Sequence, residues 1–391
     1  MTKRINKIIL IGNGFDISHG LKTKYQDFLK SYLLKCVDET EECDYPEIFK
    51  FEDSCIKLLW NRNFYKNGKQ DVKADLSQQW SFGNDLKKYI KNYNKYDRPN
   101  SNLEIYAKNS FVYSILRECF SSNWSGIEDC IYSFLKQCHI KLKGYRDDIS
   151  ISKSNSKFYN VQLEHIKSLN ASVECFKSNL ISYLRHQNSP ESFNFHLFDN
   201  RLQWGWKFDK NLFKNMDGSR DVLFLNFNYT TYYIEMIQKY QIKEHFTDNH
   251  TVFDFINIHG NINDSIDDII FGVGDEQDTM YSEIETLYDN EWLKNIKSFH
   301  YFRKEYYQKI LGFIARGDYE IFVIGHSCSI TDRTLLNMLF ENEACKKIHV
   351  YHYKGIDSYL STTYNIARNF KDKVKLREVL MPYNPNLNMN P

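Results

Sequence analysis

The chain begins with a short apolar run that leads directly into glycines. Residues 8–11 are β-branched or leucine, which favours a strand buried on both faces of a parallel sheet. Gly12 and Gly14 follow at once, and residues without side chains let a ligand approach the backbone. The dinucleotide fingerprint places a third glycine three residues later, but that position is Ile17 here and the next glycine is Gly20. The start therefore predicts a nucleotide-binding strand and turn, with a loop longer than in common dehydrogenases.

Strand-like apolar runs return in the second half of the chain, and helical patterns follow several of them. They lie at residues 222–225, 253–258, 269–271, 321–324 and 348–351. Because strands that alternate with helices build parallel sheets, this pattern predicts an α/β fold with a Rossmann-like, mostly parallel sheet.

A different pattern separates the first strand from the others. Residues 34–219 hold long amphipathic stretches with hardly a strand-like run among them. The clearest of these stretches lie at residues 103–120, 127–142 and 161–184. We therefore expect a large all-helical insertion at 34–219, an α/β core made of residues 1–33 and 220–381, and a flexible tail at residues 382–391.

Composition excludes several classes of protein. Lys plus Arg number 51 against 50 for Asp plus Glu, so no net field attracts nucleic acid or a membrane surface. The nine cysteines are odd in number and scattered, without a C-x-x-C pair, which argues against a disulfide framework and a zinc ribbon. The chain has no signal-type segment and no apolar run of ~18 residues. We expect a cytoplasmic protein without a membrane segment or a bound metal.

Polar residues follow the strand expected at residues 222–225. Asn226, Asn228, Tyr229 and Thr230 come directly after it. The carboxyl ends of strands form the ligand crevice of α/β sheets. Each asparagine alone is as well explained as a helix cap, but two of them beside an aromatic residue favour a ligand site.

Two further strand ends carry candidate residues. His259 follows the run at 253–258, where an imidazole suits a general base near neutral pH, although most histidines are surface or core residues. The segment from 269 to 276 ends in Asp275 and Glu276, and we interpret it as mainly structural. After the run at 321–324, the hydroxyl and backbone amides of a second loop suit a phosphate or a ribose. The candidates in this loop are Gly325, His326, Ser327 and Asp332.

These segments together resemble a known family. The opening GNGFDISHGLKTKY, with the later NFNYT, IHG and IGHS segments, is similar to the AbiH family, named for bacterial abortive infection against phage. Trp124 and Glu128, in SNWSGIEDC, have a spacing associated with that family. The same landmarks resemble the sirtuin nucleotide fold, and all five keep the sirtuin order. In that resemblance they are the turn Gly12, Asn13 and Gly14, then Gly20 with Leu21, Asn228, the catalytic histidine His259, and Gly325 with Ser327.

The sequence also departs from the sirtuin pattern. Asn13 stands where alanine is usual, Asp16 where serine is usual, Lys22 where proline is usual, and Thr230 where aspartate is usual. The cysteine-bound zinc module of deacetylating sirtuins is missing, which argues against deacetylation. In this respect the chain is similar to the sirtuin-like NAD hydrolases of phage defence.

The resemblance implies an antiphage effector that hydrolyses NAD at the nicotinamide–ribose bond without a metal. Asn228 would orient water and ribose hydroxyls, and His259 would accept a proton. The pyrophosphate would lie over the amides of Gly12 to Phe15, at the start of a helix. The residues expected to bind the nucleotide are Gly12, Asn13, Gly14, Phe15, Asp16, Gly20, Tyr25, Asn226, Tyr229, Gly325, His326, Ser327 and Asp332.

Control of such an enzyme implies a partner, because unrestrained NAD loss would poison the host. We expect a phage-derived trigger, an activating partner or self-assembly. Two alternatives stay open. One is a nucleotide-binding sensor of phage defence without turnover, favoured by the changes at Asn13, Asp16 and Thr230. The other is a metal-dependent nuclease or phosphohydrolase, for which only the carboxylates at 264–268 and 275–276 are dense enough.

Overall fold

The computed structural model describes residues 5–39, 41–42, 47–62, 101–117, 124–146, 157–187, 221–232, 252–274, 276 and 278–389. The chain divides into two compact units. The first unit consists of Met1–Lys24, Leu184–Tyr288 and Ile296–Pro391. The second unit consists of Tyr25–Tyr183 and Asp289–Asn295. The second unit thus begins earlier than the boundary expected after residue 33.

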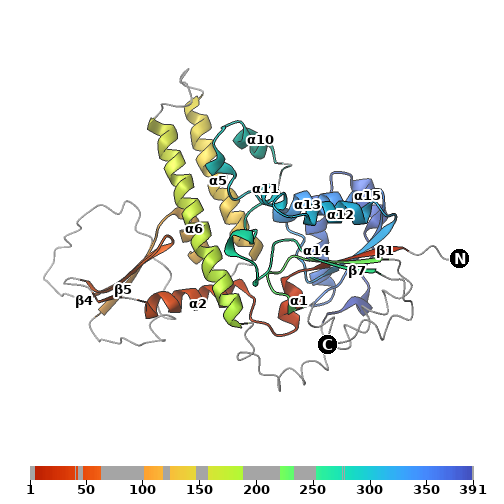
Figure 1. The fold of residues 1–391 in the computed structure, drawn as a ribbon, viewed down its shortest axis with the longest axis horizontal. Helices are drawn as coiled ribbons and strands as arrows, with labels where there is room; N and C mark the ends of the chain where they lie inside the picture. The colour runs from red at the N-terminus through yellow and green to blue at the C-terminus, as the bar shows by residue number, and fades with distance from the viewer. Residues whose placement is uncertain are drawn as a thin grey trace. The chain divides into compact units, whose positions relative to one another are not determined.

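A five-stranded sheet forms the centre of the first unit (Figure 1). All of its neighbouring strands are parallel, in the order β7-β6-β1-β8-β9. The strands are β1 (Asn6–Ile11), β6 (Asp221–Asn226), β7 (Val252–Asn257), β8 (Tyr319–Ile324) and β9 (Cys345–Val350). The prediction of a mostly parallel α/β sheet is therefore confirmed. The run at 269–271 joins no sheet strand, because it lies in a loop where Ile270 N–H donates to the His259 carbonyl at 3.0 Å.

Strand order places the candidate loops at one edge of this sheet. The chain runs outward from β1 to β6 and β7, and then returns to β8 and β9 on the other side of β1. Because all strands are parallel, their carboxyl ends share one edge, and the order of the strands reverses between β1 and β8. Open α/β sheets bind ligands at such a reversal.

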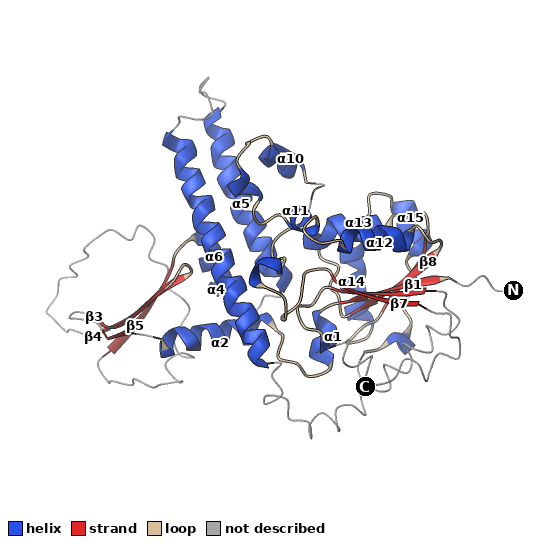
Figure 2. Ribbon diagram, in the orientation of Figure 1, coloured by secondary structure: helices blue, strands red, loops and turns tan. Residues whose placement is uncertain are grey.

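Alternate residues of β1 face two apolar clusters, as expected for a strand covered on both faces. Ile8 and Leu10 pack with buried side chains of α12, α13 and α14, whereas Ile9 and Ile11 pack with Phe15 of α1. Figure 1 and Figure 2 show α12, α13 and α15 along one face of the five-stranded sheet and α1 on the other face.

The end of the chain belongs to the second of these clusters. Leu387 and Met389 are buried in it, and their backbone exchanges hydrogen bonds with His352 at 2.9 and 2.7 Å. The described part of the tail, up to residue 389, is therefore packed, and the expectation of a flexible tail is wrong there.

Short helices complete the first unit, and two of them begin at aspartate caps. Asp278 accepts the Met280 N–H, and Asp372 accepts those of Val374 and Lys375. The α-helices are α1 (Asn13–Ser18), α10 (Thr279–Glu285), α11 (Lys297–Tyr301), α12 (Tyr306–Ile314), α13 (Arg333–Phe340), α14 (Ile356–Asn369) and α15 (Lys373–Val379). The 3-10 helices are η1 (Ile266–Asp268), η3 (Ile330–Asp332) and η4 (Pro385–Leu387).

The second unit combines helices with a four-stranded antiparallel sheet, in the order β2-β3-β4-β5. The strands are β2 (Glu41–Glu42), β3 (Glu47–Glu52), β4 (Ile56–Arg62) and β5 (Ser101–Ala107). The helices are α2 (Tyr25–Asp38), α4 (Ser110–Arg117), α5 (Trp124–Arg146), α6 (Lys157–Gln187), whose last turn belongs to the first unit, and the 3-10 helix η2 (Asn290–Leu293).

The expectation of an all-helical insertion is therefore wrong. Strand β5 occupies the start of the stretch 103–120, which the pattern predicted to be helical, and α4 begins only at Ser110. β5 pairs with β4 in a register that sets Ala107 opposite Ile56. A short apolar run does not distinguish a strand from a helix by periodicity alone, and here antiparallel pairing with β4 decides. In the described parts of the chain, no helix is long and apolar enough to cross a membrane.

Candidate functional site

Two buried polar clusters lie in the first unit, and both include residues that follow the carboxyl ends of its sheet strands. The Asp16 cluster consists of Asp16, from helix α1 after β1, and Asn228 and Thr230, from the loop after β6. The Asp332 cluster consists of Asp332, Lys297, His259 and His326. The sequence predicted Asp16, Asn228, His259, His326 and Asp332 as site residues.

The glycine turn after β1 is held by the loop after β8. The N–H of Gly12 donates to the Ile324 carbonyl at 3.0 Å, and that of Gly14 donates to the Gly325 carbonyl at 2.8 Å. The N–H of Phe15 donates to the Gly12 carbonyl at 2.9 Å. These three amides are satisfied within the protein, so they are not free to bind a phosphate in this structure.

The glycines instead allow the two loops to touch. A Cβ on Gly12 would lie 2.4 Å from the Cα of His326, and one on Gly325 would lie 2.1 Å from the Phe15 nitrogen. Gly325 also has a φ of +66°, a conformation that favours glycine. Gly14 packs against the same residue, because its Cβ would lie 2.8 Å from the Gly325 Cα. Backbone packing thus explains glycines that the sequence assigned to ligand contact.

Asp16 carries a carboxyl group with an unusual environment. It lies in α1 and is 1% exposed, and the Thr230 hydroxyl donates to its Oδ2. Burial raises the pKa of Asp16 from 3.8 to about 7, although the Thr230 hydroxyl, which donates to the carboxylate, and the neighbouring Asn228 amide oppose the shift. A carboxyl that titrates near neutral pH is suited to exchange protons with a substrate.

Asn226 shapes the loop that carries Asn228. Its Nδ2 donates to the carbonyls of Asn228 and Thr230 at 3.0 and 2.9 Å and to the Asn257 side chain at 3.0 Å. Its Oδ1 accepts the Asn228 N–H at 3.1 Å. Asn226 therefore builds the turn rather than offering donors to a ligand. By contrast, the Nδ2 of Asn228 is buried and has no hydrogen-bond partner among the described residues.

Asp332 contacts the three other residues of the Asp332 cluster. The Nζ of Lys297 lies 2.8 Å from Asp332 Oδ1, and His259 Nε2 lies 3.3 Å from the same oxygen. His326 Nε2 lies 3.5 Å from Oδ2. Burial alone would raise the pKa of Asp332, but the Lys297 ammonium and the two histidines hold it well below its usual range. The cluster therefore contains a buried carboxylate.

The hydrogen bonds of His326 fix its tautomer. Its Nδ1 accepts the Cys328 N–H at 3.0 Å, so the neutral ring carries its proton on Nε2, which faces Asp332. The ring also lies 4.1 Å from that of Phe227, centroid to centroid. His326 is thus held as a donor to the buried carboxylate.

His259 is enclosed on both sides. Its Nδ1 lies 3.2 Å from the Phe227 carbonyl, and its Nε2 faces Asp332 and, at 3.5 Å, the Tyr301 hydroxyl. Burial lowers the pKa of His259, and the charge of Lys297 lowers it further. Both ring nitrogens face protein oxygens, so the predicted role as a general base requires one of these contacts to open.

Other predicted residues lie near the same edge with structural partners. The Asn13 side chain donates to the Thr23 carbonyl at 3.0 Å, and Gly20 has a φ of +84°. The Tyr229 hydroxyl donates to the Ile270 carbonyl at 3.1 Å, and its ring centroid lies 6.4 Å from that of His259. Tyr229 is therefore a neighbour of the Asp332 cluster.

Three residues are not brought into these clusters. Tyr25 belongs to the second unit, where it is buried and its hydroxyl donates to the Ile115 carbonyl at 3.4 Å. Glu128 is also a buried residue of the second unit. Ser327 is exposed, and its carbonyl accepts a hydrogen bond from Asn365 at 2.9 Å.

Sequence reasoning missed Lys297 and Tyr301. Both lie in α11, outside every motif that follows a sheet strand. A lysine is expected on the surface, yet Lys297 is 0% exposed. No local signal distinguishes it from the chain's other lysines, because its partner Asp332 lies 35 residues later.

The acidic loops offer little to a divalent ion. Asp264 and Asp268 both pair with Lys304, at 3.0 and 3.6 Å. Glu276 is exposed, and Asp275 lies outside the described residues. The carboxylates on which the nuclease alternative depended are thus already paired or solvated where the structure describes them.

Comparison with known proteins gives a family. No curated protein and no solved structure matches the chain. A family model described as "Bacteriophage abortive infection AbiH" matches residues 8–353, a span that includes the loops after β1, β6, β7 and β8. Since this match covers most of the chain, the protein belongs to the AbiH family.

Proposed function

We propose that the protein hydrolyses NAD at the nicotinamide–ribose bond, as its part in the abortive-infection role that membership of the AbiH family implies. The observation that carries the proposal is the Asp16 cluster. A buried carboxyl with a pKa of about 7 lies beside a buried amide nitrogen, that of Asn228, which has no partner among the described residues. A buried hydrogen-bond donor without a partner, beside a carboxyl group with a raised pKa, suggests that a ligand binds there.

The position of the cluster supports a nucleotide as that ligand. Asp16 follows β1, the strand beside which the order of the parallel sheet reverses. Rossmann-like sheets hold nucleotides outside the strand ends at this point. The order of the glycine turn, Asn228, His259 and the Gly325 loop, which resembles that of sirtuins, favours NAD among nucleotides.

The chemistry of the bond fits these groups. Cleavage passes through an oxocarbenium-like state, so the enzyme must hold the ribose and position a water molecule. We assign the donor role to Asn228 Nδ2, facing the water or a ribose hydroxyl. We assign the role of proton acceptor to Asp16, because its carboxyl group has a pKa of about 7. His259 has a supporting role in the reaction through its contact with Asp332. The scheme uses no metal.

A nucleotide sensor without turnover is the second candidate. The enclosure of His259 between the Phe227 carbonyl and Asp332 favours it, since a base needs a free nitrogen. In that case the same edge would bind NAD or a related nucleotide and pass the signal to a partner or to other copies of the chain.

The test is NAD loss and nicotinamide release by the purified full chain in EDTA, with NAD binding measured on the same samples. The variants are Asn228→Ala, Asp16→Asn and His259→Ala, and the control is Asn263→Ala, at an exposed asparagine. Release that Asn228→Ala and Asp16→Asn abolish, and that the control keeps, supports hydrolysis. Binding without release, also after addition of phage lysate, favours the sensor. If the protein neither binds NAD nor releases nicotinamide, the nucleotide assignment is refuted.

A further inference from the structure

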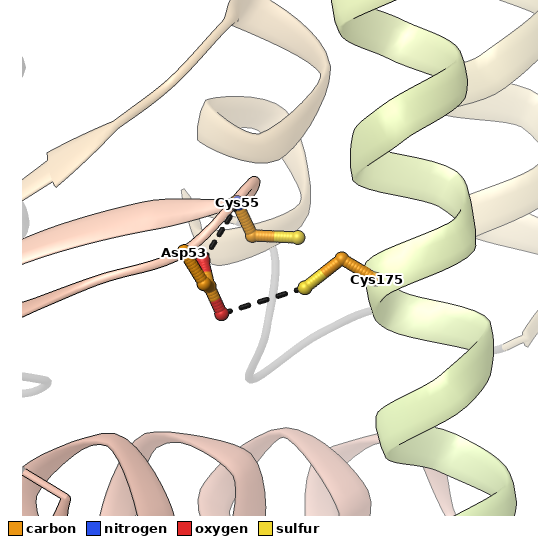
Figure 3. A group of neighbouring side chains, drawn as sticks. All are labelled: Asp53, Cys55 and Cys175. Atoms are coloured by element: carbon orange, nitrogen blue, oxygen red, sulfur yellow. Dashed lines mark hydrogen bonds between the residues drawn. The ribbon is translucent and has the colours of Figure 1, made fainter.

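A cluster of thiols and a carboxylate lies in the second unit, apart from the residues of the proposed function (Figure 3). Asp53 and Cys55 lie in the turn between β3 and β4, and Cys175 lies in α6. One ligand atom from each residue falls within 4.8 Å of the others. Among the described residues this is the one group of three such side chains close enough to hold a metal ion.

The carboxylate of Asp53 is oriented by its neighbours. Oδ1 accepts the N–H groups of Cys55 and Ile56 at 2.7 and 2.8 Å. Oδ2 accepts the Tyr32 hydroxyl at 2.6 Å and the Cys175 thiol at 3.4 Å. Ligating carboxylates in metal sites are likewise held in place by hydrogen bonds from neighbouring groups.

The turn is also fixed to α6 one helical turn before Cys175. The Ser172 hydroxyl donates to the Ser54 carbonyl at 2.8 Å, and the Cys55 thiol donates to the Ser172 carbonyl at 3.3 Å. These contacts hold the two sulfurs near each other, although the residues that bear them are far apart in the sequence. Figure 3 shows both side chains pointing into the space between the turn and α6.

We propose that the second unit binds one Zn²⁺ ion through Asp53 Oδ2 and the thiolates of Cys55 and Cys175, with water as the fourth ligand. Zinc binds sulfur at about 2.3 Å and oxygen at about 2.0 Å, so tetrahedral ligands stand about 3.5 to 3.8 Å apart. The three atoms therefore need to close by only about 1 Å. Asp53 and Cys175 are partly exposed, which gives an ion access.

Zinc is favoured over a disulfide between the two cysteines. A carboxylate oxygen lies with the two sulfurs, since Asp53 Oδ2 accepts the Cys175 thiol at 3.4 Å; a zinc ion uses such an oxygen as a ligand, whereas a disulfide does not. On binding, Zn²⁺ displaces the thiol protons. Binding then releases one proton from each cysteine to solvent and forms two Zn–S bonds, with no change of oxidation state.

The experiment measures zinc in the full chain, purified under a phosphine reductant, by elemental analysis and by competition with a chromophoric chelator. We expect one ion per chain in the wild type and its loss in Cys55→Ser and Cys175→Ser. Cys138→Ser, at a buried cysteine of α5 outside the cluster, should keep it. Tyr32→Phe, which keeps the ring but removes the donor to Asp53, should weaken affinity by about 10–100-fold.

Loading with Co²⁺ keeps the test valid if a serine variant unfolds. The wild type should show a thiolate-to-cobalt charge-transfer band, and Tyr32→Phe should require more Co²⁺ to reach it. The proposal is overturned if the wild type lacks both zinc and this band. It is equally overturned if folded Cys175→Ser binds as much zinc as the wild type, or if thiol counting finds the two cysteines joined.

Discussion

Replacing Asp16 by asparagine should make the protein more stable at alkaline pH and, if the proposed function holds, inactive. Asn is nearly isosteric with a protonated aspartate, and its carbonyl oxygen can still accept the Thr230 hydroxyl. The wild-type carboxyl must instead ionise in a site where it is 1% exposed. The variant removes this cost and leaves the shape of the cluster unchanged.

The size of the effect follows from the pKa. The folded-state pKa of Asp16 is raised from 3.8 to about 7, so between these values the folded protein keeps a proton that the unfolded chain has lost. Stability is therefore lost as pH rises through this window. A shift of about 3 pH units at about 1.36 kcal/mol per unit corresponds to roughly 4 kcal/mol in total, of which about 3 kcal/mol falls above pH 5.

Urea unfolding of wild type and Asp16→Asn, followed by circular dichroism at several values from pH 5 to pH 8, tests this reasoning. The difference between the two proteins cancels other titrating groups and should grow by about 3 kcal/mol in favour of the variant as pH rises. Asp357→Asn, at an exposed aspartate of α14, should parallel the wild type. Parallel profiles for wild type and Asp16→Asn would show that Asp16 ionises normally and would remove the main support for its catalytic role.

Three other substitutions test the packing of the sheet edge, each by urea unfolding. Lys297→Met should cost about 3–5 kcal/mol at pH 8, since it leaves Asp332 buried without its ammonium, and less at pH 6, where His259 can take up a proton beside that carboxylate. Gly325→Ala should cost more than the about 1–2 kcal/mol of its left-handed backbone, because the new Cβ would lie 2.1 Å from the Phe15 nitrogen. Asn226→Ala should cost about 1–3 kcal/mol for each carbonyl it leaves unpaired. Losses under about 0.5 kcal/mol, typical of surface sites, would contradict each of these assignments.

The parallel sheet was predictable because its strands carry strong local signals. Residues 8–11 and 222–225 are continuous apolar runs, as strands covered on both faces require. The antiparallel sheet of the second unit was not. The segment LEIYA in β5 is short and fits a strand or a helix, and only its register with β4 decides between them. Long-range pairing of this kind leaves no local trace in one sequence.

In the candidate site, too, the residues with a local sequence signal could be predicted, whereas those placed by long-range contacts could not. Asn228 and His259 were predictable because they follow strands directly, and parallel strands bring their carboxyl ends together. The partners that set their chemistry were not, since Lys297 reaches Asp332 from a short helix with no motif. The zinc ligands escape spacing rules for a similar reason, because Cys175 lies 122 residues from Asp53.

The glycines at the start of the chain show where one sequence permits two interpretations. A ligand and a neighbouring backbone both require the absence of a Cβ, so GNG predicts close approach without saying what approaches. Here the loop after β8 approaches, and it occupies the amides of Gly12 and Gly14. These two amides are therefore not available to the proposed nucleotide, and the proposal assigns its recognition to side chains, foremost Asp16 and Asn228. For that reason the Asp16→Asn variant, which preserves the turn, separates a ligand site from a packing motif better than any substitution of a glycine.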